Sequence, residues 1–311
     1  MTAIGASAGR PGSPESRACT DVIDHLRLPG IADLHVHFMP PRVMAAVWRY
    51  FESAGPLVGR DWPIRYRGSD AERVALLRSF GVELFAGLTY AHKPAMAQFL
   101  TEWSLGFAAG VRGAVATGTF FPEPGVRDYV VTAVERGCRL FKIHLQVGDF
   151  DPRDPLLDDV WGELADVGVP VVVHAGSGPM PGRFTGPGPI AQVLARHPRL
   201  SLIFAHFGMP EEVEFVSLAQ QFPNCGLDTT MVETDFMREM HVLDAAVLPA
   251  IRDLGVAGRV FFGSDFPNIP YRYDHQVDVL ERWELGDDWL AAVLWGNAAR
   301  QFGVSVSSAE L

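Results

Sequence analysis

Two histidines close the first apolar run of the chain, which reads Asp33-Leu34-His35-Val36-His37. Side chains alternate along a strand, so His35 and His37 share a face about 6–7 Å apart, and Leu34 and Val36 point toward the helices. Two imidazoles placed in this way can bind one divalent cation. Asp33 is expected deeper on the same face, where it can orient a ligand. Burying two imidazoles without partners is costly, so the pair favours a metal site over two core histidines.

Three further apolar runs end in one ligand-type residue followed by a loop. His174 follows three valines, His206 follows Leu-Ile-Phe-Ala, and Asp265 follows Phe-Phe-Gly-Ser. Packing of a core gives no reason for a histidine or an aspartate at each of these ends. Imidazole and carboxylate ligands suit zinc, and also manganese or iron. The set therefore predicts a metal site with one divalent cation, for which zinc is the first choice and Mn²⁺ or Fe²⁺ the alternatives.

Another run, Phe141-Lys142-Ile143-His144, places Lys142 and His144 on one face. A lysine ammonium inside a protein needs a counter-charge, a lowered pKa or chemical modification. The alternative is a lysine at a strand end whose ammonium reaches solvent. We interpret Lys142 and His144 as catalytic residues.

The positions of these residues follow from an alternation of apolar runs and amphipathic segments. Eight runs read as strands: Ile31–Phe38, Val82–Thr89, Arg112–Thr119, Arg139–His144, Pro170–His174, Leu200–His206, Cys225–Thr229 and Arg259–Asp265. Helical patterns between them include Asp128–Arg136, Leu157–Val167, Ile190–His197, Glu211–Gln221 and Asp244–Leu254. This alternation predicts an α/β protein with a closed (β/α)₈ barrel, whose active sites lie at the carboxyl ends of the strands. An open doubly wound sheet is the alternative, but no GxGxxG motif follows the first strand.

The pattern indicates one barrel domain over residues 18–311, preceded by a disordered tail over residues 1–17. The tail is rich in Gly, Ser, Pro and Ala and lacks the apolar run of a signal peptide. Residues 40–70 exceed the needs of one crossover and contain Trp48 and Trp62. We expect this segment to form a short cap insertion over the barrel mouth, after the first strand.

The amino-acid composition of the chain limits the classes of molecule that it is expected to bind. The formal net charge of −11 argues against a nucleic-acid-binding face, and no run approaches the ~20 apolar residues of a membrane span. The three cysteines have no CxxC spacing, which argues against a cysteine zinc site and a disulfide framework. We expect a cytoplasmic protein that acts on a small-molecule substrate, and the sequence permits a homodimer.

Together the motifs DxHxH, KIH, VVHAG, FAHFG and GSDFP resemble those of the amidohydrolase superfamily, and most closely its amidohydrolase 2 branch, which includes aminocarboxymuconate-semialdehyde decarboxylase-like enzymes. The resemblance runs from about Ile31 to Val304. It implies a (β/α)₈ barrel with one or two divalent cations at its mouth. It further implies that His35, His37, His174 and Asp265 are metal ligands, that Asp265 is also the proton shuttle, and that His206 holds or polarises substrate or water.

Lys142 resembles the strand-four lysine that binuclear relatives such as dihydroorotase carbamylate to bridge two metals. Decarboxylases of the branch generally lack this lysine, so its presence favours hydrolysis. Because the branch is mostly mononuclear, we expect one metal, with Lys142 unmodified and in contact with substrate or Asp265.

The first hypothesis for function is a hydrolase in which metal-bound hydroxide cleaves an amide, lactone or ester-like bond, because a bound Zn²⁺ lowers the pKa of its water to ~7. The second is a metal-dependent non-oxidative decarboxylase of a small carboxylic acid, and the third is a binding protein without catalysis. Arg183 and Arg272 lie in loops that leave strand ends and are candidates to bind a substrate carboxylate, and His92 is a third candidate substrate contact.

Overall fold

The computed structural model describes residues 12–304 and contains the eight expected parallel strands. The third of them is interrupted at Ala116, so that it is divided into β3 and β4. The bounds are Ile31–Val36 (β1), Val82–Gly87 (β2), Ala114–Val115 (β3), Thr117–Gly118 (β4), Leu140–His144 (β5), Val171–His174 (β6), Leu202–Phe204 (β7), Gly226–Asp228 (β8) and Val260–Phe261 (β9).

The strands form a closed barrel. Strands β1–β2–β3 and β4–β5–β6–β7–β8–β9 pair in parallel in the order of the sequence. The first and last strands meet through backbone hydrogen bonds from Leu34 N to Phe262 O (2.8 Å) and from His37 N to Phe266 O (2.7 Å). The expected (β/α)₈ barrel is therefore confirmed, and the open doubly wound sheet is excluded.

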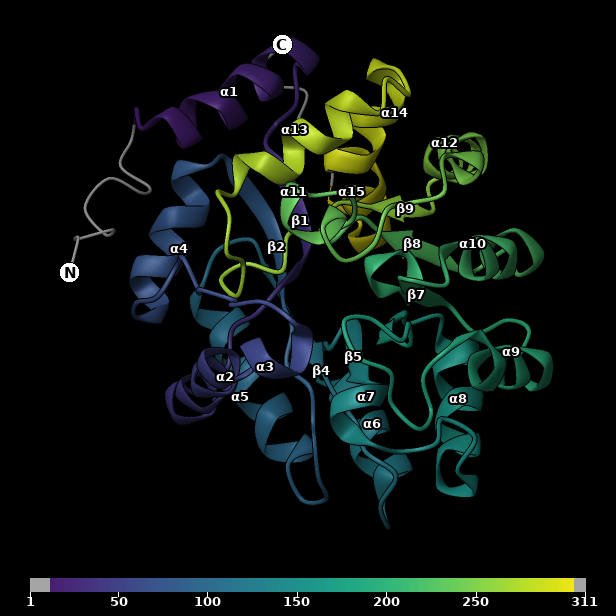
Figure 1. Cartoon of the computed structure of the whole chain (residues 1–311). Helices are drawn as coiled ribbons and strands as arrows, with labels where there is room; N and C mark the ends of the chain where they lie inside the picture. The colour runs from purple at the N-terminus through teal and green to yellow at the C-terminus, as the bar shows by residue number, and fades with distance from the viewer. Residues whose placement is uncertain (1–11, 305–311) are drawn as a thin grey trace.

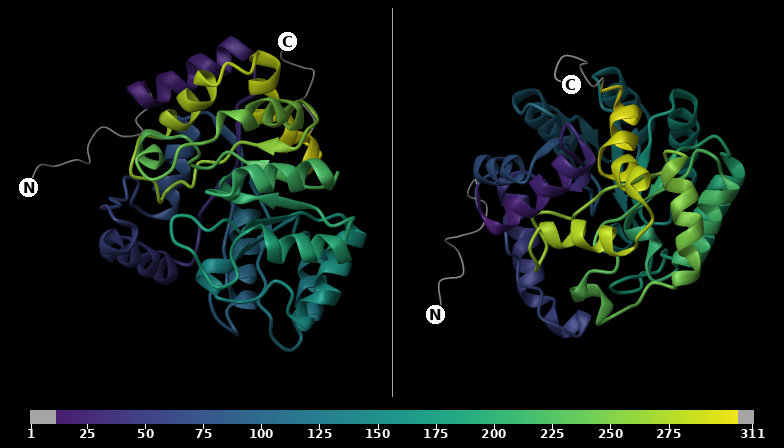
Figure 2. Two further views of the ribbon diagram at one scale, coloured as in Figure 1. Left: turned by 45° about the vertical axis from the view of Figure 1, so that its right-hand side comes forward. Right: turned by 90° about the horizontal axis from the view of Figure 1, so that it is seen from above.

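Helices surround the strands, as Figures 1 and 2 show. The connecting helices are Asp70–Ser79 (α4), Ala97–Gly110 (α5), Val126–Glu135 (α6), Pro155–Val167 (α8), Pro187–Arg196 (α9), Glu212–Gln221 (α10), Leu248–Val256 (α12), Asp274–Arg282 (α13), Asp287–Ala291 (α14) and Asn297–Phe302 (α15). Short helices at Leu145–Gly148 (α7) and Asp235–Arg238 (α11) belong to loops at strand ends.

Helix α8 illustrates how the sequence defines these helices. Its N-cap residue Asp154 accepts a hydrogen bond from Leu156 N, and Pro155 occupies the first turn, where it has no N–H to lose. Its C-cap residue Gly168 adopts a left-handed conformation with φ 69°. The helix buries one apolar stripe with the i, i+3, i+4, i+7 spacing of a face that packs on a barrel: Leu157, Val160, Trp161 and Leu164.

The expected boundary of the N-terminal tail is wrong. Helix α1 (Pro14–Leu26) begins inside the segment 1–17, with Ser13 as its N-cap, and residues 1–11 lie outside the described part of the chain. Tertiary contacts stabilise this helix, because the Glu15 carboxylate accepts hydrogen bonds from the Tyr66 hydroxyl and from Tyr273 N. Helix α1 packs against α13 beside the barrel (Figure 1).

The segment after β1 forms the cap. It contains helices α2 (Pro41–Ser53) and α3 (Gly55–Val58), followed by an extended stretch that includes the buried Trp62. Both helices contribute side chains to the cavity at the barrel mouth, as do Met39 and Trp62 on either side of them.

The three cysteines are free thiols and all are buried. Within residues 12–304, none of the helices combines the length and apolar character that crossing a membrane requires.

Candidate metal centre

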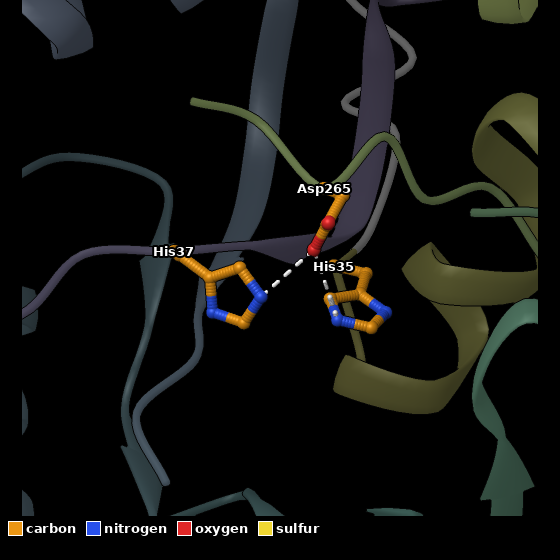
Figure 3. Close-up of side chains that lie close together, drawn as sticks. All are labelled: His35, His37 and Asp265. Atoms are coloured by element: carbon orange, nitrogen blue, oxygen red, sulfur yellow. Dashed lines mark ion pairs between the residues drawn. The ribbon is translucent and has the colours of Figure 1, made fainter. Parts of the chain in front are cut away.

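Three ligand-type side chains converge at the carboxyl ends of the strands. Asp265 Oδ1 lies 2.9 Å from His37 Nε2 and 3.7 Å from His35 Nε2, and the three ligand atoms lie within 4.8 Å of one another. Figure 3 shows both imidazoles turned toward the same carboxylate oxygen. All three side chains are buried. Two nitrogen atoms and an oxygen atom at this spacing are a donor set suited to one divalent cation.

The hydrogen bonds on the far side of each ring fix which nitrogen faces this point. His35 Nδ1 lies 2.8 Å from Asp228 Oδ2, and His37 Nδ1 lies 3.1 Å from the Leu88 carbonyl. Both partners are acceptors, so both rings carry their proton on Nδ1 and present the Nε2 lone pair to the centre. The residues present therefore fit a divalent cation held by His35, His37 and Asp265.

His206 and His174 stand beside this group. The rings of His206 and His35 have centroids 5.2 Å apart, and the rings of His206 and His174 have centroids 4.8 Å apart. His206 Nδ1 donates to the Thr230 carbonyl (3.0 Å), which leaves the Nε2 lone pair free. His174 Nε2 donates to the Gly178 carbonyl (3.0 Å), which leaves its Nδ1 lone pair. His174 is thus adjacent to the convergent group but outside it, and its role as a fourth ligand stays a prediction.

Two of these residues occupy strained backbone positions. His206 has φ 55° and Asp265 has φ 67°, in the left-handed region that few non-glycine residues adopt. Asp228 Oδ1 accepts a hydrogen bond from His206 N (2.9 Å), and the His35 carbonyl accepts one from Asp265 N (2.8 Å). The surrounding hydrogen bonds therefore hold the turns that aim both side chains into the barrel mouth.

Strand β1 departs from the simple alternation that the sequence suggests. Its pairing with β2 shifts register between Asp33 and Val36, which pair with Phe85 and Gly87. Leu34 consequently joins the cluster inside the barrel rather than facing the helices. His35 and His37 still reach the same site.

The register shift places Asp33 in the outer layer, so its expected role beside the histidines is wrong. Its carboxylate accepts hydrogen bonds from Ser264 Oγ (2.6 Å), the Tyr273 hydroxyl (2.8 Å) and His35 N (3.1 Å), and none of its hydrogen bonds within residues 12–304 comes from an imidazole. Burial raises the pKa of Asp33 to about 7. The carboxylate that orients the His35 ring is Asp228 instead.

Lys142 is buried at the centre itself. Its Nζ lies 3.2 Å from His35 Nε2, and burial lowers its pKa to about 8, against the opposing charges of Asp228 and Asp265. Of its two expected partners, substrate or Asp265, Lys142 makes no ion pair with Asp265 among residues 12–304. Lys142 therefore contacts the convergent group at His35, and its amine can hold or donate a proton there.

His144 presents a donor. Its Nδ1 accepts a hydrogen bond from Val147 N (3.3 Å), so the remaining proton is on Nε2. Its ring stacks on that of His174, with centroids 3.8 Å apart and planes inclined by 11°. Burial is the largest of the causes that lower the pKa of His144 well below its ordinary value, so the ring is neutral at pH 7.

A cavity of about 490 Å³ opens above these residues. Its base carries the polar side chains His35, His37, Lys142, His144, His174, His206 and Asp265. Its walls and roof are mostly apolar and include Met39, Val43, Val47, Phe51, Trp62, Met180, Met209, Met231 and Met237. The volume and the mixture of an apolar wall with few polar groups are typical of a small-molecule site.

The three residues predicted to contact substrate occupy different positions relative to the cavity. His92 lines the cavity at an exposed position. Arg183 is exposed outside it, with its guanidinium over the Phe184 ring, and Arg272 forms a bidentate ion pair with Asp274. Their placement does not support the prediction that these arginines grip a substrate carboxylate, because neither side chain reaches the cavity.

Sequence reasoning missed two residues of the site. Asp228 ends the apolar strand β8 in the sequence Gly-Leu-Asp-Thr, the same signal that identified His174 and His206. Asn268 follows Asp265 by three residues and lines the cavity. Its loop position gave no periodic signal from which its direction could be inferred.

A barrel with imidazoles and a carboxylate converging at its mouth defines a metal-dependent enzyme. The sequence matches the family model described as "Amidohydrolase" over residues 32–304, and the chain belongs to that family. No curated protein matches the sequence.

Solved structures share the fold. An uncharacterised TIM-barrel protein from Bordetella bronchiseptica has a TM-score of 0.66 and 17% identity, covering 88% of this chain and 99% of its own. An amidohydrolase from Burkholderia multivorans with bound zinc has a TM-score of 0.59 and 20% identity, covering 88% and 99%. A dihydroxybenzoic acid decarboxylase from Polaromonas, with bound manganese and 2-nitroresorcinol, has a TM-score of 0.59 and 17% identity, covering 90% and 98%.

Proposed function

We propose that this protein is a metal-dependent hydrolase that cleaves an amide, lactone or ester-like bond of a small, largely apolar molecule. The observation that carries the proposal is the position of Asp265, whose Oδ1 is aimed at both His35 and His37 at the base of the apolar cavity. A carboxylate so placed can hold a cation and also reach a proton on a reacting water.

His35, His37 and Asp265 would hold the cation, and His174 would be the fourth ligand. Zinc is the first choice and manganese the alternative, as in the similar barrels that carry these ions. When bound, the cation supplies Lewis acidity, which activates water and polarises a carbonyl.

Asp265 acts as the general base, taking a proton from the attacking water and then delivering it to the leaving group. Lys142 Nζ and His144 Nε2 are the N–H donors at the base of the cavity, and they stabilise the negative charge that develops on the substrate carbonyl oxygen.

We assign His206 the first of its two expected roles, holding substrate or water, rather than polarising it. Its Nδ1 proton is committed to Thr230, and burial lowers the pKa of the ring, so neutral His206 offers a lone pair at Nε2 rather than a donor. His206 therefore positions water or a substrate hydroxyl by accepting a hydrogen bond.

The second candidate is a non-oxidative decarboxylase. The similarity to the dihydroxybenzoic acid decarboxylase barrel and the apolar cavity walls favour it, because a carboxylate loses carbon dioxide more readily away from water. Here Lys142 would bind the carboxylate, and Asp265 would pass a proton taken from water to the carbon whose bond to the carboxylate breaks as carbon dioxide leaves.

Turnover in ¹⁸O-labelled water tests the proposal. Zinc-loaded protein is given a panel of aryl esters, aryl lactones, anilides and hydroxybenzoic acids, with metal-depleted protein as the control. We expect ¹⁸O in the acid product of an ester, lactone or anilide. Release of carbon dioxide from a hydroxybenzoic acid, without hydrolysis of any panel member, would instead establish the decarboxylase.

A further inference from the structure

Asn268 joins the cap to the loop that carries Asp265. Its Oδ1 accepts a hydrogen bond from Trp48 Nε1 (3.1 Å), and its backbone carbonyl accepts one from Trp62 Nε1 (2.8 Å). Its backbone N–H donates to the Asp265 carbonyl (2.9 Å). Two cap tryptophans thus fix one asparagine three residues beyond the proposed catalytic base.

These bonds also fix the direction of the side-chain amide. An indole N–H only donates, so the atom facing Trp48 must be the amide oxygen, and Nδ2 lies on the other side. Asn268 is 2% exposed and lines the cavity. Its Nδ2 makes no hydrogen bond to any residue in the described range 12–304. A buried amide with two unused N–H groups beside a cavity is suited to bind an acceptor on a ligand.

The rest of the cavity restricts what carries that acceptor. Among the described residues that line it, Lys142 is the one lysine or arginine, and it lies at the base against His35. The cap contributes Val43, Val47 and Phe51 to its lining, and the loops after the later strands contribute methionines. A second carboxylate on the substrate would be buried there without a cation, which is costly.

We propose that Asn268 is a substrate-binding residue whose Nδ2 donates to one uncharged acceptor, such as a ketone, ester or amide oxygen, on the body of an otherwise apolar substrate. The proposal rests on the proposed function only in that the same cavity receives the substrate. A cavity with this donor and these apolar walls selects neutral or singly charged aromatic or branched aliphatic substrates and rejects dicarboxylates. Trp48 acts as a positioning residue, because it holds the amide in the donating orientation.

Binding of matched probes tests this without turnover. The probes are 3- and 4-acetylbenzoate and their 3- and 4-ethyl counterparts, which differ in a carbonyl acceptor but have similar shapes. Dissociation constants are measured by calorimetry on zinc-loaded protein. We expect wild type to bind one acetyl compound about 3- to 10-fold more tightly than its ethyl partner, the range for one neutral hydrogen bond.

Three variants test whether the acetyl preference depends on the Nδ2 donor of Asn268 or on a general change in the cavity. Asn268→Asp keeps an oxygen for Trp48 but removes the donor, and should abolish the acetyl preference. Trp48→Phe should reduce it, because the amide is no longer oriented. Val47→Ala, which alters the cavity wall alone, should weaken both partners equally and retain the preference.

The results of these measurements distinguish the role of Asn268 from the proposed hydrolase function. An equal acetyl preference in wild type and Asn268→Asp, no preference in wild type, or no binding of any of the four probes would each overturn the role of Asn268. The acetyl preference could instead change in the three variants as expected, while the protein hydrolyses no ester, lactone or anilide. That result would support the role of Asn268 and contradict the proposed hydrolase function.

Discussion

Replacing Asp228 with asparagine should weaken metal binding, although this residue is not a proposed ligand. Its Oδ2 holds the Nδ1 proton of His35, and its Oδ1 accepts from His206 N (2.9 Å) and Thr230 N (3.2 Å). In the variant, the amide oxygen stays with the two backbone donors, and the amide NH₂ faces His35 Nδ1. The imidazole must then accept there and carry its proton on Nε2, the nitrogen that faces the centre.

The magnitude follows from this tautomer change. Loss of a hydrogen-bond partner behind a metal ligand typically costs 10- to 100-fold in affinity, or about 1.4–2.7 kcal/mol. We expect the upper half of that range, because the variant replaces an acceptor by a donor rather than deleting it. Burial alone favours a neutral carboxyl, but the hydrogen bond from His35 and the positive charge of Lys142 oppose it and lower the pKa of Asp228, so wild type presents an ionised acceptor.

Competition against a chromophoric chelator measures the zinc dissociation constant. Asp158→Asn is a matched control, because it removes a similar contact, Asp158 Oδ1 to His197 Nε2 at 3.0 Å, away from the site. The control should bind zinc as wild type does. A folded Asp228→Asn protein whose zinc affinity is within about threefold of wild type would show that the His35 tautomer does not control zinc binding.

Three other outcomes are expected. Asp265→Asn should lose at least ~10²-fold in turnover, while measured zinc occupancy remains substantial, because an amide coordinates weakly but accepts no proton; near wild-type turnover of a metal-replete variant would contradict the shuttle role. Lys142 should be unmodified in an intact-mass spectrum, with one metal equivalent per chain by elemental analysis, whereas a carbamate mass on Lys142 with two equivalents would show a binuclear site. The thiols of Cys19, Cys138 and Cys225 are buried and should react with a disulfide reagent only after the protein is unfolded in guanidinium. Burial raises the pKa of Cys138 and of Cys225 to about 12, which disfavours the reactive thiolate. Fast reaction of any of the three thiols in the native protein would contradict this prediction.

Much of the fold could be predicted because the strands of a barrel are buried on both faces. Runs such as Val171–His174 and Leu202–Phe204 are continuously apolar up to the polar residue that ends them, and this signal needs no tertiary information. The first turn of α1 could not be recognised in a segment rich in Ser, Pro and Gly, because its stability depends on the contact of Glu15 with Tyr66 from a distant part of the chain.

The site was predictable to the extent that it depends on strand ends. The convergence of His35, His37 and Asp265 could be predicted because parallel strands bring their carboxyl ends to one mouth. The role of Asp33 was misjudged because a register shift cannot be read from alternation. The structure does not support the prediction for Arg272, because its partner, Asp274, begins helix α13 two residues further on, and the conformation of the preceding loop decides where the guanidinium goes.

The metal content and metal position can be measured together by elemental analysis of zinc-loaded protein and anomalous scattering from a crystal of the same sample. We expect one zinc per chain and a single peak roughly 2.0–2.2 Å from His35 Nε2, His37 Nε2 and an Asp265 oxygen. We also expect His174 in the fourth protein position. A zinc peak elsewhere, or a fully loaded crystal in which His35, His37 and Asp265 share no ion, would contradict the proposed metal site.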